Sequence, residues 1–497
     1  MIPSAYQRAI YQVFQRTNRN LNIQAVAGSG KTTVLLELLK YVPSRAHAIF
    51  LAFNNSIVNE LRDRNQRDNV QITTLHSCGW RAIMNRYGRV KMNPNKAIAK
   101  TEVVLKRHNI TDVRRGYYFY IVPKIVDLMR CNLCTADEKS VMELTTNYGL
   151  DLVDKDDVKI ILEAFELMTR DRSQFDFMDM IYVPVTDATV RLTKFDYVFC
   201  DESQDFSVCQ QELIKRVISR TGRLVTVGDP RQAIYGFAGA DAESYSKLAA
   251  VNGSSVTMPL SVCYRCARSI VREANSVVPE IHYAPTAVEG VVREGSLLEL
   301  QQGDWVVCRN LKPLIQTYLW LMRNKIKSVV RGKDIGEGIL ALISKIGRKT
   351  IAGLLRGLDD EHNAIERRLR ERGVRKPELH PKMELFLQRQ EVITYLCTEV
   401  DSVQALCDLI RKIFSDDVKA IVLSTIHKSK GLENDRVFFL IPGLIPSRFA
   451  VMDWQFEQEE NLRYVAITRA KRELVYVSSE MFLQDLRCEI KKNKYVE

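Results

Sequence analysis

Residues 22–40 read NIQAVAGSGKTTVLLELLK, in which a short apolar run of strand type leads through small residues into a helical pattern. The central part, AVAGSGKTT (25–33), is typical of a phosphate-binding loop, because small residues let backbone N–H groups approach phosphates and the helix start adds partial positive charge. Lys31 is then placed to reach the β- and γ-phosphates, and the Thr32 hydroxyl to ligate Mg²⁺. Ala25 stands where the general pattern has its first glycine. The residues expected to bind the nucleotide here are Ala27, Gly28, Ser29, Gly30, Lys31, Thr32 and Thr33.

A second apolar run, FDYVFCDESQD (195–205), contains the adjacent carboxylates Asp201 and Glu202 after its strand-like part. Mg²⁺ keeps several waters and takes few carboxylates, so Asp201 is expected to hold the ion through its water shell. Glu202 is placed to orient or deprotonate the attacking water. Paired acids also occur in exposed turns, but a phosphate-binding loop in the same chain favours the catalytic interpretation.

Apolar runs of buried-strand type alternate with helical patterns along the chain, which predicts parallel sheets covered by helices on both faces. These runs are NIQAVA (22–27), AIFLAF (48–53), YVFCDE (197–202), LVTVGD (224–229), WVVCRN (305–310), AIVLST (420–425), VFFLI (437–441) and ELVYVSS (473–479). Two regions are instead helical and rich in charge. We therefore predict an α/β fold of two units, each interrupted by a helical insertion. The expected boundaries are 1–85 with 176–255 around the insertion 86–175, and 256–345 with 416–497 around the insertion 346–415.

The chain has 497 residues, of which 46% are hydrophobic and 27% charged, and its net charge is +12. This excess of positive charge favours a polyanionic partner such as nucleic acid, although a membrane surface or plain solubility also fits it. The amino terminus has no apolar signal-peptide core, and no stretch reaches the roughly 18 apolar residues of a membrane span. We expect an intracellular, soluble protein that is not secreted and does not associate with a membrane.

The chain contains eleven cysteines, an odd number that is typical of reduced intracellular thiols. Two CxxC pairs occur, Cys131 with Cys134 and Cys263 with Cys266. Their separation matches no standard zinc-ribbon spacing, so we interpret them as small packed residues rather than metal ligands.

The segment VGDPRQAIYGFAGAD (227–241) runs from a strand end through a turn to Gln232 and then to two aromatic residues, Tyr235 and Phe237. Burial does not explain two rings so close together in a polar segment rich in turn residues. From the residues alone, the rings are either core aromatics or exposed faces for stacking.

Taken together, these segments resemble the UvrD/Rep-like branch of the superfamily 1 DNA helicases, whose fold has two RecA-like motor domains. The motifs follow the family's order from residue 4 to about residue 475. Besides those above, they are SAYQRAI (4–10), AFNNSIVNELRDR (52–64), TLHS (74–77), DFMDMI (176–181), LSVCYRCARSIVREAN (260–275), STIHKSKGLENDRVFFL (424–440) and EENLRYVAITRAKREL (459–474).

The resemblance implies that ATP and Mg²⁺ are the cofactors, with Gln7 reading the adenine edge and Glu433 binding the ribose. It implies that Arg469 is an arginine finger with Tyr464 packed near it. Because Arg265 and Arg469 belong to the second motor domain, hydrolysis is expected to require both domains. The resulting catalytic set is Lys31, Asp201, Glu202, Gln232, Arg265 and Arg469.

The resemblance also implies a track for single-stranded DNA. Tyr235 and Phe237 would stack on bases, an interaction worth about 1–3 kcal/mol per base and tolerant of sequence. The other expected DNA-binding residues are Phe53, Asn55, Thr74, His76, Thr425, His427, Lys428 and Lys430. The chain departs from the family at Ala238, where arginine is usual. We expect this change to affect binding to the DNA strand more than ATP hydrolysis.

Smaller departures are Ser203 in place of alanine, and Cys263 and Cys266 in place of asparagine and serine. The second insertion is short for the family. Its basic residues either touch duplex DNA or form a solvated helix face, and the sequence leaves both open.

We predict an ATP-dependent helicase or translocase that moves 3′→5′ on single-stranded DNA and unwinds duplex DNA, in replication, repair or recombination. The alternatives are a translocase that remodels protein–DNA complexes without productive unwinding, a nucleotide-switched nucleic-acid-binding protein, and a small-molecule kinase. The expected partners are single-stranded DNA, junctions of single and double strands, and replication or repair proteins. Since all catalytic parts lie on one chain, we expect a monomer.

Overall fold

The computed structural model describes residues 3–52, 55–65, 67–110, 114–148, 150, 155–234, 244–251, 255–371, 376–414, 420–450 and 453–488. The chain divides into two compact units, Met1–Tyr264 and Arg265–Glu497. In the described part of the chain, no helix has the length and hydropathy required to cross a membrane.

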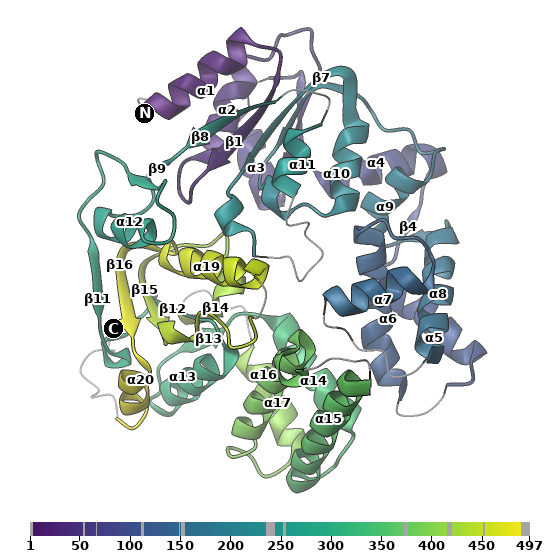
Figure 1. Cartoon of the computed structure of the whole chain (residues 1–497), viewed down its shortest axis with the longest axis vertical. Helices are drawn as coiled ribbons and strands as arrows, with labels where there is room; N and C mark the ends of the chain where they lie inside the picture. The colour runs from purple at the N-terminus through teal and green to yellow at the C-terminus, as the bar shows by residue number, and fades with distance from the viewer. Residues whose placement is uncertain are drawn as a thin grey trace. The chain divides into compact units, whose positions relative to one another are not determined.

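The first unit is built on a six-stranded sheet in the order β3-β2-β6-β7-β1-β8, of which β7, β1 and β8 are labelled in Figure 1. All of its pairings are parallel. Its strands are β1 (Asn20–Ala25), β2 (Ala48–Ala52), β3 (Val70–Thr74), β6 (Phe195–Cys200), β7 (Ile218–Gly228) and β8 (Ser255–Leu260). Because parallel strands end at the same edge of a sheet, the loops after β1, β6 and β7 converge there.

Helices cover both faces of this sheet, which confirms the predicted α/β arrangement. On β2, Phe50 faces one core with α1 and α2, while Ile49 and Leu51 face another core with α4 and α10. The helices of the motor part are α1 (Ala5–Arg16), α2 (Lys31–Lys40), α3 (Asn55–Arg64), α4 (Leu75–Tyr87), α9 (Asp179–Thr186), α10 (Val208–Val217) and α11 (Ser244–Ala249).

The helical insertion of the first unit comprises α5 (Lys96–Arg107), α6 (Arg114–Cys131), α7 (Glu138–Asn147) and α8 (Lys155–Arg170). The two-stranded pair β4 (Lys91–Met92) and β5 (Gln174–Phe175) joins its two ends. A buried ionic network ties the insertion to α9. Arg130 on α6 binds both carboxylate oxygens of Asp176 at 2.9 Å, and Lys96 on α5 lies 2.6 Å from Asp179.

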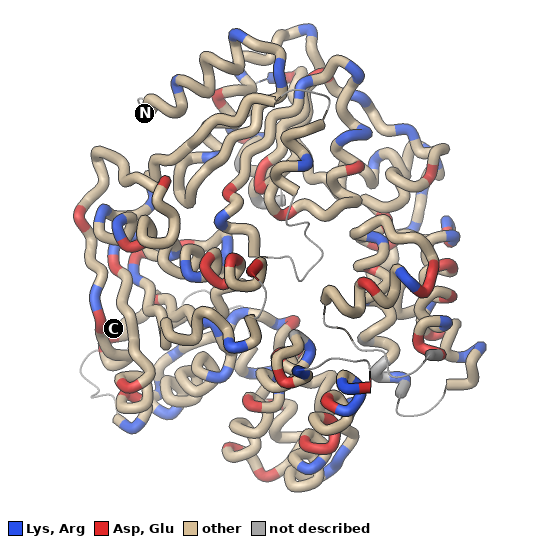
Figure 2. Tube along the Cα trace, viewed as in Figure 1, with Lys and Arg blue, Asp and Glu red and all other residues tan. Residues whose placement is uncertain are grey.

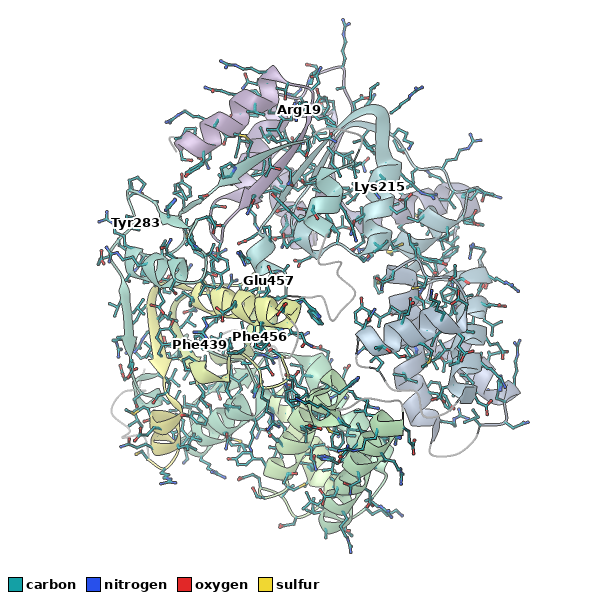
Figure 3. The ribbon with its side chains drawn as sticks, viewed as in Figure 1. Arg19, Lys215, Tyr283, Phe439, Phe456 and Glu457 are labelled. Carbon is teal, nitrogen blue, oxygen red and sulfur yellow. The ribbon has the colours of Figure 1, made fainter. Side chains whose placement is uncertain are left out.

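The second unit contains another six-stranded parallel sheet, in the order β11-β16-β15-β12-β14-β13. Its strands are β11 (Val291–Glu294), β12 (Trp305–Cys308), β13 (Ser328–Val330), β14 (Ile421–Thr425), β15 (Asn434–Leu440) and β16 (Ala470–Val477). Phe439 on β15, labelled in Figure 3, packs beside Tyr476 on β16 with ring centroids 5.6 Å apart. Two parallel sheets of this kind confirm the predicted pair of RecA-like domains.

The remaining elements of the second motor are the strand β10 (His282–Tyr283) and five helices, while the strand β9 (Val262–Cys263) belongs to the first unit. The helices are α12 (Arg268–Asn275), α13 (Leu311–Arg323), α18 (Ile426–Ser429), α19 (Asp453–Ile467) and α20 (Ser479–Asp485).

The second insertion consists of α14 (Lys333–Ile346), α15 (Ile351–Glu371), α16 (Pro381–Leu396) and α17 (Val403–Ile413). It begins earlier than the predicted residue 346, because α14 packs against α15 and α17. Positively and negatively charged residues are mixed along these helices (Figure 2). Several of them pair within the insertion, as Lys345 does with Glu361 at 2.8 Å.

The division between the units also differs from the predicted boundary at residue 255. Strand β8 pairs with β1 along its whole length, and Arg19 (Figure 3) donates to the carbonyl of Ser255 at 2.9 Å. The segment SVTMPL was not recognised as a strand because it contains Pro259, which only an edge strand tolerates. The first unit therefore extends to Tyr264.

Candidate nucleotide and nucleic-acid site

The loop after β1 turns sharply into α2. Gly28 and Gly30 have φ angles of +65° and +80°, a region that glycine enters without the steric cost of a side chain. Between them, Ser29 is fully buried, and its Oγ has no hydrogen-bond partner among the described residues. A buried hydroxyl and the open helix start both favour a bound anion at this position.

The ends of β1 and β6 bring the predicted catalytic residues together. Lys31 Nζ lies 2.6 Å from Glu202 Oε2, and the Thr32 hydroxyl lies 3.5 Å from Asp201 Oδ2. Asp229, which follows β7, also acts on Lys31 electrostatically. Three carboxylates therefore surround one lysine.

Burial strongly disfavours charge on two of these acids. It raises the pKa of Asp201 to about 6, with the neighbouring Glu202 charge adding to the effect, and it raises the pKa of Asp229 to about 6 against the attraction of Lys31. Burial alone lowers the pKa of Lys31, but the carboxylates outweigh it and the pKa is raised. Oxygen donors in a site short of positive charge fit Mg²⁺, with Thr32 and Asp201 as the residues that would hold it.

Glu202 has an uncommon backbone conformation. Its φ is +51°, a left-handed value that costs a residue with a side chain about 1–2 kcal/mol. Its N–H donates to Asp201 Oδ1 at 2.8 Å, and its carboxylate accepts from Lys31 and from Gln204 Nε2 at 2.7 Å. Such strain concentrates at functional sites, where surrounding contacts hold it in place.

Two predicted glutamines lie next to this cluster. Gln7 is buried, forms a capping box with Ser4 at the start of α1, and directs its amide nitrogen towards Gly30 of the loop. Gln232 Nε2 donates to Asp229 Oδ2 at 2.7 Å. Tyr264, to which we assigned no role, donates its backbone N–H to the carbonyl of Gly28 at 2.8 Å.

Of the predicted DNA-binding residues in the first unit, Thr74 caps α4 by accepting the N–H of Ser77 at 3.1 Å. His76 is half-buried, and burial lowers its pKa below the usual value. Asn55 is the first residue of α3. Phe53, Tyr235, Phe237 and Ala238 lie outside the described residues.

In the second unit, Arg265 forms an ion pair with Glu433, and Lys471 Nζ lies 3.6 Å from the other oxygen of that carboxylate. Arg469 is fully buried and donates to the carbonyls of Val465 at 2.9 Å and Leu432 at 2.6 Å. Burial lowers the pKa of Arg469 to about 10, and the nearby Arg265 charge contributes. For Arg469 to reach a phosphate, some of these carbonyl contacts must be exchanged.

Tyr464 is also fully buried, on α19 and five residues before Arg469. The Thr425 hydroxyl caps α18 by accepting the N–H of Lys428 at 3.4 Å. Burial lowers the pKa of His427 to about 3, with Arg309 the next cause, so its imidazole is neutral. Lys428 Nζ lies 2.8 Å from Asp334 at the start of α14.

Lys430, the last of the predicted DNA-binding residues in this unit, is half-buried.

The structure thus groups the predicted residues within each unit. In the first unit, the predicted members of the cluster are Lys31, Thr32, Asp201, Glu202 and Gln232. In the second unit, Arg265, Glu433 and Arg469 lie near one another.

Sequence reasoning missed two members of the first cluster, Asp229 and Gln204. Both lie inside motifs that were recognised, VGDPRQ and DESQD. A polar residue directly after an apolar strand was the available signal for Asp229. For Gln204, the sequence offered only its position two residues after Glu202.

Two parallel sheets, with a phosphate-binding loop and paired carboxylates at the carboxyl edge of the first, define a P-loop protein with two RecA-like units. The chain matches the UvrD/REP helicase N-terminal domain over residues 6–251 and the UvrD-like helicase C-terminal domain over residues 402–480. It therefore belongs to the UvrD/Rep-like family of superfamily 1 helicases.

Curated relatives support this membership. The chain is 22% identical to F-box DNA helicase protein 1 of Schizosaccharomyces pombe, in a match that covers 97% of this chain and 58% of that protein. It is 24% identical to the ATP-dependent DNA helicase PcrA of Bacillus subtilis, over 54% of this chain and 38% of that protein. PcrA of Staphylococcus aureus strain Mu50 is 25% identical over 54% of this chain and 39% of its own length. The chain thus matches between about two fifths and three fifths of the length of these relatives.

Proposed function

We propose that this chain is an ATP-driven motor that moves 3′→5′ along single-stranded DNA and unwinds duplex DNA ahead of it. The observation that supports this most is the position of Gln232. It is hydrogen-bonded to Asp229 within the acidic cluster around Lys31. It also lies only a few residues before Tyr235 and Phe237, the proposed stacking residues. Nucleotide chemistry and base contacts would therefore share one short segment.

In this proposal, Lys31 and the backbone N–H groups of residues 28–32 bind the phosphates. Bound Mg²⁺ would neutralise charge on the phosphates, held by Thr32 and Asp201. Lys31 must leave Glu202 to reach a phosphate, and this frees an oxygen of Glu202 to accept a proton from the attacking water.

Arg469 would stabilise the charge that develops on the transferred phosphoryl group. Arginine fingers contribute about 10³–10⁵ in rate in related chemistry. The carbonyls of Val465 and Leu432 hold its guanidinium in the present conformation. We therefore propose that a conformational change of the 429–432 segment accompanies hydrolysis.

Binding to DNA would come from neutralisation of its phosphates and from stacking of its bases on aromatic side chains, with little sequence preference. The net charge of +12 and membership of a helicase family both support a nucleic-acid partner. We further propose that the chain acts as a monomer in replication, repair or recombination.

The test is steady-state ATP hydrolysis with no nucleic acid, with single-stranded DNA, with duplex DNA and with single-stranded RNA. We expect strong stimulation by single-stranded DNA, and the variant Lys31→Ala as the background control. A rate that is indifferent to every nucleic acid would contradict the motor and favour a nucleotide switch or a small-molecule enzyme.

A further inference from the structure

The edge of the first sheet opposite the catalytic cluster is strongly basic. Strands β3, β2, β6, β7 and β1 are consecutive neighbours in this parallel sheet, so all five begin at that amino edge. The segments that lead into them are 16–20, 41–48, 65–70, 191–196 and 212–223. These segments contain ten cationic residues, which we call the basic rim: Arg16, Arg19, Arg45, Arg67, Arg191, Lys194, Lys215, Arg216, Arg220 and Arg223. Their three acidic residues are Asp68, Asp196 and Glu212, so the segments together have a net charge of +7.

Much of the charge of the basic rim is not neutralised within the protein. Arg67 and Lys194 each donate to two backbone carbonyls rather than to a carboxylate. Arg16, Arg45 and Arg220 are exposed, and among the described residues none forms a hydrogen bond or an ion pair with their side chains. These five cations are therefore available to an anion from outside the chain.

Arg223 adds a buried positive charge behind the exposed ones. It is 4% exposed, and its guanidinium donates to the carbonyls of Arg19 at 2.7 Å and Phe14 at 2.6 Å. Its Nη2 has no hydrogen-bond partner among the described residues. Burial lowers the pKa of Arg223 to about 10, so the side chain is still charged at neutral pH. Because salt screens a buried charge less than an exposed one, Arg223 raises the potential of the whole rim.

Stabilisation of helix ends does not account for this charge. The helices that precede the five strands are α1, α2, α3, α9 and α10, and each ends at the same edge of the sheet. The carboxyl end of a helix carries about −0.5 charge, so the five ends together supply about −2.5. This offsets less than half of the net charge of +7 in these segments.

The residues between the cations indicate which polyanion fits the rim. They are small or polar in the two most basic stretches, RTNR (16–19) and SRTGR (219–223). A stable protein interface has an apolar core, and a track for single strands has aromatic faces on which bases stack. Tyr41, the exposed aromatic residue of these segments, instead packs beside Tyr11 with ring centroids 6.2 Å apart. The rim therefore offers charge without a stacking face or an apolar core, which favours the backbone of a duplex.

We propose that the basic rim binds the phosphate backbone of double-stranded DNA, as a second nucleic-acid surface of the first unit. Neighbouring strands lie about 4.8 Å apart, so the five strand starts span about 20 Å, the length of about six phosphates along one strand of a duplex. The six residues of β1 separate this edge from the catalytic edge by about 20 Å. Contacts to phosphates alone carry no sequence information, so the rim binds duplexes of any sequence. This binding needs neither ATP nor movement and does not depend on the proposed motor.

Two variants with equal loss of charge test the proposal. The rim variant replaces three exposed cations of the amino edge and combines Arg16→Gln, Arg45→Gln and Arg220→Gln. The control variant replaces three exposed cations of the second unit and combines Arg323→Gln, Lys325→Gln and Arg487→Gln. A thermal unfolding curve of each variant checks that the fold is kept.

The measurement is the Kd for a short blunt-ended DNA duplex as a function of salt, by fluorescence anisotropy, with single-stranded oligothymidylate and ATP turnover measured alongside. We expect the slope of log affinity against log salt to become less steep by about 2.7 in the rim variant, because each lost phosphate contact contributes about 0.9. We expect the affinity for the duplex at low salt to fall by about tenfold or more. The control variant should keep the wild-type slope, and the rim variant should keep its affinity for oligothymidylate and its ATP turnover.

A wild-type slope for the duplex in the rim variant would overturn the proposal. An equal change in the control variant would also overturn it, because net charge alone would then explain the effect. Equal losses for the duplex and for oligothymidylate would assign the three residues to a single-strand track instead. Polyglutamate that displaces the duplex from the wild-type chain as well as a duplex of equal charge does would indicate an acidic protein partner. If ATP hydrolysis ignores nucleic acid, the proposed motor fails separately, and the duplex measurement still decides for or against the rim.

Discussion

Replacing Asp229 by asparagine is predicted to stabilise the nucleotide-free protein at neutral pH. Asp229 is 1% exposed, and burial raises its pKa to about 6. Its oxygens accept the N–H of Arg231 at 3.1 Å and the side-chain amide of Gln232 at 2.7 Å. Asparagine retains an acceptor for Arg231, and the Gln232 amide can rotate to present its oxygen instead. Asp229→Asn therefore removes a charge at almost constant shape.

The magnitude follows from the difference in pKa between the unfolded and folded states. A carboxyl group whose pKa is raised in the folded state stabilises that state fully when the pH is below the unfolded-state pKa of 3.8. This stabilisation is lost as the pH rises through the folded-state pKa of about 6. One pKa unit corresponds to about 1.4 kcal/mol, so the loss at pH 7 and above is about 3 kcal/mol. The uncharged asparagine side chain has no such loss, and Asp229→Asn should gain about 3 kcal/mol at pH 7 but less than about 1 kcal/mol at pH 4.

The assay is urea unfolding of both proteins between pH 4 and 8 without nucleotide or Mg²⁺. Asp187→Asn is the control of opposite sign. Burial raises the pKa of Asp187, but hydrogen bonds led by those from Tyr87 and Thr189 outweigh it and hold the pKa at about 2. This variant should lose about 1 kcal/mol at pH 7, because solvent screening weakens the contribution of this partly exposed carboxylate. A stability difference for Asp229→Asn that is zero, or that does not grow with pH, would refute the reasoning.

Further substitutions test the proposed roles. Lys31→Ala should lower ATP turnover by at least about 100-fold while single-stranded DNA binding, measured by fluorescence anisotropy, persists. Arg469→Ala should lower kcat by about 10³-fold or more with smaller change in nucleotide affinity, measured by single-turnover hydrolysis. Lys428→Ala should reduce the slope of log affinity against log salt by about 0.7, because one phosphate contact is lost. Phe237→Ala should hydrolyse ATP without moving, and normal stepping in a translocation assay would indicate that the ring is a core residue.

The central cluster was predictable because strong local signals and one topological rule agree. Apolar strands that alternate with helices predict a parallel sheet, and its strands end at one edge. That rule places Lys31, Asp201 and Gln232 near one another without any knowledge of side-chain contacts. The short and edge strands β3, β8, β11 and β13 have weaker apolar patterns in the sequence. Because β8 was not recognised as a strand, the predicted boundary at residue 255 lies before the end of the first unit.

Contacts that depend on side-chain geometry were not predictable. The hydrogen bond from the Asp229 N–H to the Gln204 side chain depends on how β6 and β7 align, and sequence spacing does not reveal it. One of the carbonyls that hold Arg469, that of Leu432, belongs to a residue distant in the sequence. The start of the second insertion at α14 was missed because its apolar helical pattern resembles that of a motor helix.

The most direct test of the proposed motor is strand displacement on duplex DNA with a 3′ single-stranded tail, a 5′ tail or blunt ends, in the presence of Mg²⁺ and ATP. The account predicts unwinding of the 3′-tailed duplex, little with the other two substrates, and none by Lys31→Ala. Efficient unwinding from the 5′ tail would contradict the direction of movement. ATP hydrolysis stimulated by single-stranded DNA with no displacement from any substrate would contradict unwinding, and would favour a translocase that removes proteins from single strands.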